Sequence, residues 1–285
     1  MFVVASKCSD GTIEYITIPA DHLAEGIPTT IYKPEVVPDN PVIIVYFRGG
    51  GLVVGLLKIC MPMLMSIVHY TGAILVAPEY RNLPCPEDRF APFTDCEAAA
   101  RWVLDNKPAV GGVVDSPVGL SGDSAGGQLC CSVNYSIPNQ FAFQVLYYPV
   151  TNLEREGYES FEELWSVPAF SGRDMAQLLE WCQLLEEPSQ IDNPRVNPSA
   201  PRYDPPLSAS PPTLLIIAEL DPLRDWGTEY AAKLRDAGVH TEEHVVEGVT
   251  HGFTFSVSNF KTCSARAFQT TADFVQQFKP QQQKL

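Results

Sequence analysis

The sequence predicts an α/β fold, built on a mostly parallel sheet of eight strands with helices on both of its faces. Short apolar runs rich in Val, Ile and Leu alternate along the chain with longer segments of helical periodicity. This alternation is typical of parallel strands joined by crossover helices. A long irregular segment between two of the predicted strands further predicts a small helical cap inserted into the fold.

Five of the predicted strands are nearly continuous apolar runs, which is typical of central strands buried on both faces. They cover residues 42–47, 73–77, 118–120, 143–147 and 213–218. The other three predicted strands cover residues 13–18, 29–32 and 240–246.

Five helices are predicted between and after these strands, at residues 94–106, 125–135, 173–187, 226–236 and 265–278. Thr94 is a suitable N-cap for the first of them. Gly238 follows the fourth, where glycine readily adopts the left-handed backbone that ends helices. The order of strands and helices is therefore that of one α/β domain.

Residues 151–210 interrupt this order, because they are rich in proline and acidic residues and contain one confident helix. A stretch of that size between two core strands is typical of an inserted cap rather than of a loop. We therefore expect a single domain over residues 1–285, with residues 151–210 as the cap and residues 279–285 as a flexible tail.

The composition excludes several classes of partner. The net charge of −15 argues against nucleic acid, because binding phosphates needs concentrated Lys and Arg. No run predicts a membrane span: residues 49–67 are apolar but are interrupted by Lys58 and Pro62. Residues 1–11 show no signal peptide, and the eight cysteines form no CxxC pair and no zinc-like cluster. These features predict a cytoplasmic protein with reduced thiols and no metal site.

Residues 122–126, Gly-Asp-Ser-Ala-Gly, match the G-x-S-x-G pattern and lie between a predicted strand and a predicted helix. A serine there occupies a sharp, strained turn, and a Cβ at either flanking glycine would collide with neighbouring elements. The helix that follows directs its N-terminal amides at the same place, where they favour developing negative charge. We therefore predict that Ser124 is a nucleophile.

A serine hydroxyl is nearly inert until a base removes its proton, so the site needs a histidine. His251 lies in a glycine-flanked loop after the last predicted strand, which gives the chain order Ser, acid, His. The other histidines lie before the sheet core, at a helix end or within a predicted strand: His22, His69, His240 and His244. His251 is therefore the predicted base.

The acid that orients this histidine should follow a strand between the serine and the histidine. Three carboxylates directly follow the strand predicted at residues 213–218. Asp221 is the predicted acid, because it lies in the strand-end turn that Pro222 stiffens. Glu219 and Asp225 remain alternatives.

Arg48 is followed by three glycines, Gly49 to Gly51, directly after the strand predicted at residues 42–47. Backbone N–H groups in such a run are free to point at a ligand. Three glycines in an ordinary turn would also carry a needless entropy cost. The run therefore predicts a loop that stabilises an oxyanion.

These segments together resemble the hormone-sensitive-lipase-like branch of the α/β-hydrolases, which includes bacterial esterases and arylacetamide deacetylase. The resemblance extends from about residue 42 to residue 255. It rests on residues 48–51, 78–81, 86–90, 122–127, 221–225 and 251–253.

The resemblance implies one α/β-hydrolase catalytic domain that hydrolyses carboxylic esters with short or medium acyl chains and needs no cofactor. It implies a Ser124, His251 and Asp221 triad, and an oxyanion hole from the amides of Gly50, Gly51 and Ala125. Members of this family often form dimers, so a homodimer is a further expectation. The sequence itself does not identify the physiological ester.

The chain departs from the family at two places. The family has His where this chain has Arg48, and the arginine could anchor the loop through a carboxylate or offer a cation to an acidic substrate. The family also often carries N-terminal capping helices, whereas this chain reaches its first predicted strand at residue 13. Residues 151–210 would then form the main lid over the site.

Two alternative functions share this fold. One is a small-molecule receptor that has lost catalysis and so resembles the gibberellin receptors. Such receptors, however, typically lack one member of the triad. The other is an amidase or deacetylase, because a Ser, His and Asp triad by itself does not discriminate an amide from an ester.

Overall fold

The computed structural model describes residues 4–8, 11–55, 57–167, 170–183, 188–202, 204–255 and 258–280. Within these ranges the chain forms a nine-stranded sheet in the order β1-β2-β3-β5-β4-β6-β7-β8-β9. The strands are β1 (Val4–Cys8), β2 (Gly11–Ala20), β3 (Leu23–Pro34), β4 (Ile43–Phe47), β5 (Ile74–Pro78), β6 (Val118–Asp123), β7 (Gln144–Tyr147), β8 (Thr213–Leu220) and β9 (Thr241–Thr250).

The sheet is mixed but mostly parallel. Strands β1, β2 and β3 pair antiparallel, and β3 also pairs antiparallel with β5. Every pair from β5 through β4, β6, β7 and β8 to β9 is parallel. The prediction of a mostly parallel sheet is confirmed, and all eight predicted strands are present. Strand β1 adds a ninth at the edge, where a strand of only five residues gives too short a pattern to indicate a strand.

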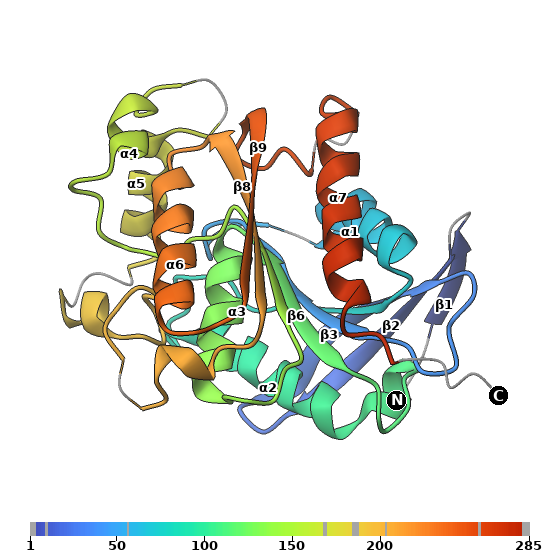
Figure 1. Cartoon of the computed structure of the whole chain (residues 1–285). Helices are drawn as coiled ribbons and strands as arrows, with labels where there is room; N and C mark the ends of the chain where they lie inside the picture. The colour runs from blue at the N-terminus through green and yellow to red at the C-terminus, as the bar shows by residue number, and fades with distance from the viewer. Residues whose placement is uncertain are drawn as a thin grey trace.

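Helices cover both faces of the sheet, as predicted (Figure 1). Alternate residues of each strand face opposite sides, so that Ile43 and Val45 pack in one core cluster and Ile44 and Tyr46 in the other. The first cluster includes residues of α2 (Ala91–Asp105), α3 (Ala125–Ser136) and α6 (Arg224–Asp236). The second includes residues of α1 (Leu57–Thr71) and α7 (Lys261–Gln276).

Helix α1 is absent from the predicted set. Its sequence is apolar almost throughout and contains Pro62, so its periodicity is weak. The helix nevertheless forms, because Leu57, Met63, Leu64 and other side chains along it are buried against the sheet and α7. Tertiary burial therefore overrides a poor local signal.

Residues 151–210, called the cap below, connect β7 to β8 and contain α4 (Glu159–Glu163) and α5 (Gly172–Trp181). In Figure 1 both helices lie at the upper end of the molecule, beside the end of β8. Helix α5 begins with a capping box, in which Ser171 and Asp174 each bind the other's backbone N–H. The helix predicted at residues 173–187 corresponds to α5, but it ends at Trp181, and residues 184–187 lie outside the described residues.

The part of the chain that the structure describes contains no helix long and apolar enough to cross a membrane. Of the tail predicted at residues 279–285, residues 281–285 lie outside the described part. The carboxyl ends of β4, β6, β8 and β9 meet at one edge of the sheet, because these strands run parallel. The residues that follow those four ends build the candidate site.

Candidate active site

Ser124 occupies a strained turn between β6 and α3, with φ of 53° and ψ of −121°. A Cβ at Gly126 would lie 1.9 Å from the carbonyl oxygen of Phe47, and one at Gly122 would lie 2.4 Å from the carbonyl carbon of Gly126. The N–H of Ser124 donates to the carbonyl of Tyr147 at 2.8 Å, which holds the turn against β7. A side chain at either glycine would therefore collide with the backbone, as predicted.

Three predicted residues meet beyond the carboxyl ends of the parallel strands. The His251 Nε2 lies 2.9 Å from the Ser124 Oγ, and its Nδ1 lies 2.7 Å from the Asp221 Oδ2. The second Asp221 oxygen accepts from the N–H of Leu223 at 2.8 Å, and the carboxylate is 1% exposed. A buried carboxylate with both oxygens occupied fixes the imidazole so that Nδ1 donates and Nε2 faces the serine.

The pairing register explains this meeting. Leu220 at the end of β8 pairs with Thr250 at the end of β9, and Asp221 and His251 are the next residues of each strand. The two alternative acids have other partners. Glu219 accepts from the Gly248 N–H. Asp225 accepts from the Ser160 N–H and from Arg224. Asp221 is the one of the three carboxylates that bonds His251.

Two aromatic rings enclose the imidazole of His251, and sequence reasoning missed both. The Tyr148 ring meets it edge-on, with ring centroids 4.9 Å apart and planes at 61°. The Phe170 ring, from the cap, stacks on it with centroids 4.3 Å apart and planes at 29°. Tyr148 has a left-handed backbone, with φ of 34°, and its hydroxyl bonds that of Thr254. The rings restrict the imidazole and shield it from water.

The run predicted to stabilise an oxyanion, residues 48–51, begins a longer loop. This loop, residues 48–55, is called the oxyanion loop below, and Asp123 holds it close to Ser124. The Asp123 Oδ1 accepts from the Gly49 N–H at 2.8 Å and from the Tyr46 hydroxyl. Gly50 has φ of 113°, and its carbonyl accepts from the N–H groups of Val53 and Val54. This tight turn needs glycine, since a Cβ at Gly50 would lie 1.9 Å from the Val54 carbonyl oxygen.

The backbone N–H groups of Gly50, Gly51 and Ala125 donate to no acceptor among the described residues. Ala125 is the first residue of α3, where helical N–H groups have no partner within the helix. Gly51 and Ala125 also line the same pocket. The three amides predicted for the oxyanion hole are thus available to a ligand, which is the arrangement that the role requires.

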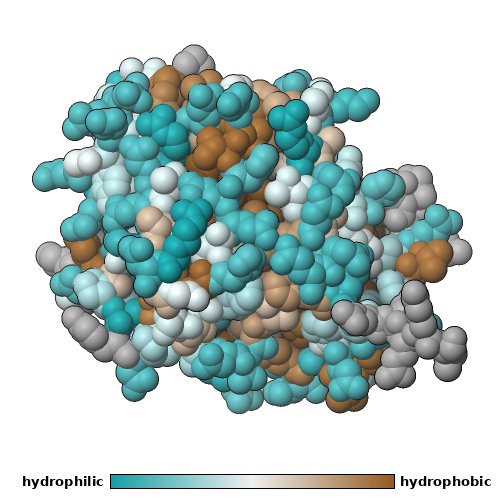
Figure 2. Space-filling view, viewed as in Figure 1, coloured by the Kyte–Doolittle hydropathy of each residue, from teal (hydrophilic) through white to brown (hydrophobic). Residues whose placement is uncertain are grey.

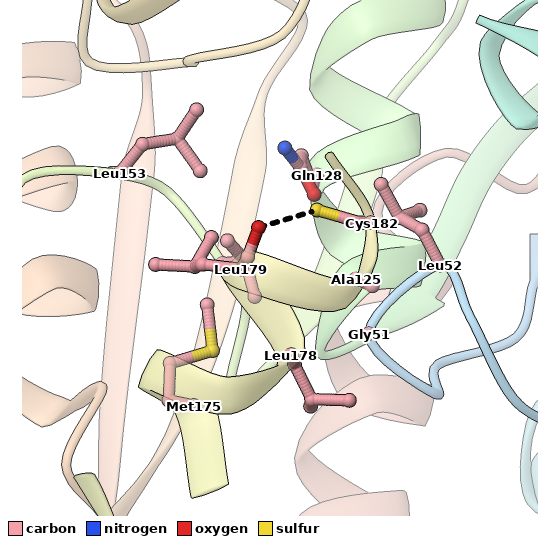
Figure 3. A pocket seen from close by; sticks show the side chains of 10 residues that line it. Gly51, Leu52, Ala125, Gln128, Leu153, Met175, Leu178, Leu179 and Cys182 are labelled. Atoms are coloured by element: carbon pink, nitrogen blue, oxygen red, sulfur yellow. Dashed lines mark hydrogen bonds between the residues drawn. The ribbon is translucent and has the colours of Figure 1, made fainter. Parts of the chain in front are cut away.

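The pocket beside these amides is a narrow, nearly filled hollow that opens to solvent (Figure 3). Apolar side chains form most of its wall, and α5 of the cap supplies one side of it. Leu178 lies against the oxyanion loop, since a Cβ at Gly51 would be 2.6 Å from its Cδ1. The lining residues are Gly51, Leu52, Ala125, Gln128, Val150, Leu153, Met175, Leu178, Leu179 and Cys182.

The outer surface contrasts with this pocket. Figure 2 shows a largely hydrophilic face, in keeping with the net charge of −15, and an apolar patch near the upper ends of β8 and β9. Leu220, at the end of β8, is 41% exposed. Exposed apolar surface therefore lies beside the ends of the two strands that lead to Asp221 and His251.

Comparison with known proteins gives consistent matches over most of the chain. Residues 44–255 match the family described as alpha/beta hydrolase fold. The carboxylesterase NlhH of Mycobacterium tuberculosis is 32% identical over 246 residues, which cover 85% of this chain and 75% of that protein. The ethyl acetate hydrolase of Pseudomonas putida is 31% identical over 244 residues, covering 80% of this chain and 71% of that protein.

Solved structures agree with these sequence matches. An esterase of Pyrobaculum calidifontis has a TM-score of 0.83 at 29% identity, covering 93% of this chain and 85% of that one. Carboxyl esterase 2 of the fungus Tuber melanosporum has a TM-score of 0.81 at 26% identity, covering 93% of this chain and 87% of that one.

Burial of Asp123 predicts a pH-dependent stability. Burial raises the pKa of this carboxyl to about 6, although hydrogen bonds from Tyr46 and Gly49 oppose the rise. Between pH 4 and pH 6 the folded chain therefore keeps a proton that the unfolded chain has lost, so stability falls as the pH rises through this window. The change from this group is about 2–3 kcal/mol.

The variant Asp123→Asn removes this titration, because its amide stays neutral at every pH. Urea unfolding of both proteins from pH 4 to pH 7 should show the wild type losing about 2–3 kcal/mol relative to the variant. Comparing the two proteins cancels the contributions of all other titrating groups. A difference in unfolding free energy that does not change with pH would contradict the prediction.

Proposed function

The chain belongs to the hormone-sensitive-lipase-like family of α/β-hydrolases and is a carboxylic ester hydrolase, and we propose that Ser124 forms its acyl-enzyme. The observation that carries the proposal is the continuous hydrogen-bond chain from Ser124 through His251 to Asp221. Such a chain activates a serine hydroxyl, which otherwise is a weak nucleophile at neutral pH.

In the first step, the Nε2 of His251 takes the proton of the Ser124 hydroxyl while the Oγ attacks the ester carbonyl carbon. Asp221 accepts from Nδ1–H and stabilises the imidazolium that forms. The carbonyl oxygen becomes an oxyanion, and the amides of Gly50, Gly51 and Ala125 receive it. Donors fixed before the reaction stabilise this charge without reorganising.

The tetrahedral intermediate then collapses. The bond to the alcohol breaks, and His251 returns its proton to the leaving oxygen, which leaves an ester between the acyl group and Ser124. A water molecule, deprotonated by the same imidazole, attacks this ester and releases the acid. Stacking of Phe170 on His251 keeps the imidazole in the orientation that both steps need.

The acyl group of the substrate is short to medium in length on this proposal. The pocket beside Gly51 and Ala125 is narrow and apolar, and Leu178 presses on its glycine side. An ethyl acetate hydrolase among the relatives supports the short end of that range. A larger acyl group would require movement of α5, because the cap supplies that wall of the pocket.

The two alternative functions gain no specific support from the site. A receptor without catalysis has no need for a buried carboxylate that holds a histidine against a serine. An amidase would use the same residues, and no observation at the site favours an amide over an ester, whereas similar proteins include a carboxylesterase and an ethyl acetate hydrolase. Ester hydrolysis therefore remains the proposal.

Substitutions in the triad test it directly. Ser124→Ala and His251→Ala should each lower kcat by about 10⁴- to 10⁶-fold, and Asp221→Asn by about 10⁴-fold, because each breaks the same relay. The double variant Ser124→Ala/His251→Ala should be no worse than either single one. Turnover of a chromogenic acetate ester gives kcat, and a fluorophosphonate reports whether Ser124 is nucleophilic.

Two matched variants provide the controls. Ser132→Ala changes a buried serine of α3, the helix that follows Ser124, and His240→Ala changes a histidine that pairs with Glu242 at the surface. Both should keep wild-type turnover and labelling. If the wild type is not labelled, or if Ser124→Ala still turns over the ester, the acyl-enzyme proposal is wrong.

Leu178 tests the proposed chain length. Leu178→Ala removes the side chain that lies against Gly51, so the ratio of kcat/KM for a hexanoate over an acetate ester should rise about 10-fold or more. A p-nitrophenyl ester series from acetate to octanoate measures the ratio. Leu104→Ala is the control, because Leu104 is also a half-buried helical leucine but lines a different hollow. An unchanged ratio would show that this pocket does not receive the acyl chain.

A further inference from the structure

Arg48 stands at the start of the oxyanion loop, where the family has His, and its side chain is 1% exposed. A guanidinium is rarely buried so completely unless all of its donors are occupied. Its five N–H donors have five acceptors here, which is the full capacity of the group. We propose that Arg48 is a positioning residue that holds the oxyanion loop in its donating conformation, an inference that rests on the function proposed above.

Two of the five bonds bind the loop itself. The Nη1 of Arg48 donates to the carbonyl oxygens of Gly49, at 3.3 Å, and of Val54, at 3.0 Å. These carbonyls lie before and after Gly50 and Gly51, whose amides are the ones proposed to receive the oxyanion. The loop also wraps closely around the guanidinium, since a Cβ at Gly55 would lie 2.9 Å from the Nη1. Arg48 thereby fixes the distance between the two sides of the oxyanion loop.

The other three bonds tie the guanidinium to the segment after β5. Its Nε donates to the Glu79 Oε1 at 2.8 Å, and its Nη2 donates to the Tyr80 carbonyl at 3.1 Å and the Asn82 Oδ1 at 2.9 Å. The guanidinium carbon lies 4.0 Å from the centre of the Tyr80 ring. The second oxygen of Glu79 accepts from the N–H of Leu57, the first residue of α1. Loop, strand end and helix start therefore share one anchor.

This arrangement decides between the two roles that the sequence leaves open for Arg48. A cation that recognised an acidic substrate would need a donor directed at the pocket, and all five donors are occupied by the protein. A histidine offers at most two N–H donors, whereas the planar guanidinium supplies five in a fixed fork. Arg48 can therefore bridge the loop and the segment after β5 at once.

The test compares Arg48→Met with Arg81→Met. Methionine keeps the apolar volume of the side chain and removes every donor, so the orientation of the loop amides is no longer fixed. We therefore expect kcat to fall about 10²- to 10³-fold, with KM changed by less than about 3-fold. Affinity for a trifluoromethyl ketone, whose adduct with Ser124 places an oxyanion in the hole, should fall in parallel. Arg81 lies in the same segment after β5, pairs with buried Asp95 of α2 and forms no hydrogen bond or ion pair with the described residues of the loop. Arg81→Met should lower the Tm but keep kcat near that of the wild type.

Three results would overturn the inference: a folded Arg48→Met with wild-type kcat, an equal loss of kcat in Arg81→Met, or a loss confined to the KM of an anionic hemisuccinate ester. Should Arg48→Met not fold, Glu79→Gln replaces the test, because an amide can supply only one of the two acceptor oxygens. It should lower kcat about 10-fold at unchanged KM, and an unchanged kcat would again refute the inference. A wild type without ester turnover or fluorophosphonate labelling would instead refute the proposed function itself.

Discussion

The site depends on one close approach, that of the first turn of α3 to the ends of β4 and β6. The helix can come this near only because Gly122, Gly126 and Gly127 have no side chains, and a Cβ at the last of these would lie 2.6 Å from the Cβ of Pro149. The approach forces the chain to turn within one residue between strand and helix. Ser124 therefore has a backbone conformation that few residues with a side chain adopt, and its hydroxyl stands above the sheet edge.

From this turn the parallel pairing of the strands brings the remaining parts together. The end of β6 lies beside the end of β4, so Asp123 can reach the N–H of Gly49 in the neighbouring loop. The ends of β8 and β9 lie further along the same edge and carry Asp221 and His251. The proposed catalytic groups are thus supported by the strand ends, whereas Phe170 and one side of the pocket come from the cap. On the proposed function, the cap therefore contributes to substrate selection and the strand ends carry the chemistry.

The sequence was sufficient to predict eight of the nine strands, the presence of helices on both faces of the sheet and the residues that meet at Ser124. These predictions work because strand burial and the glycine pattern around the serine are local signals, and because the order of serine, acid and histidine can be read along the chain without knowing any contact. The sequence was insufficient for contacts between segments that are distant along the chain. Nothing near Phe170 indicates that its ring lies on His251, and nothing near Arg48 identifies Glu79 or Asn82 as its partners.

The contacts that the sequence does not reveal solve a problem that the predicted motif creates. Consecutive glycines give the loop its free amides but also the largest conformational freedom of any residue, so the loop cannot fix its own geometry. A mobile N–H donor stabilises the oxyanion less than a donor that is fixed in place before the charge develops. Asp123 restrains the loop from the side of the nucleophile, and Arg48 restrains it from the side of β5. Because both anchors are buried, water competes little for their hydrogen bonds, and the glycine loop acquires from its surroundings the rigidity that its own sequence lacks.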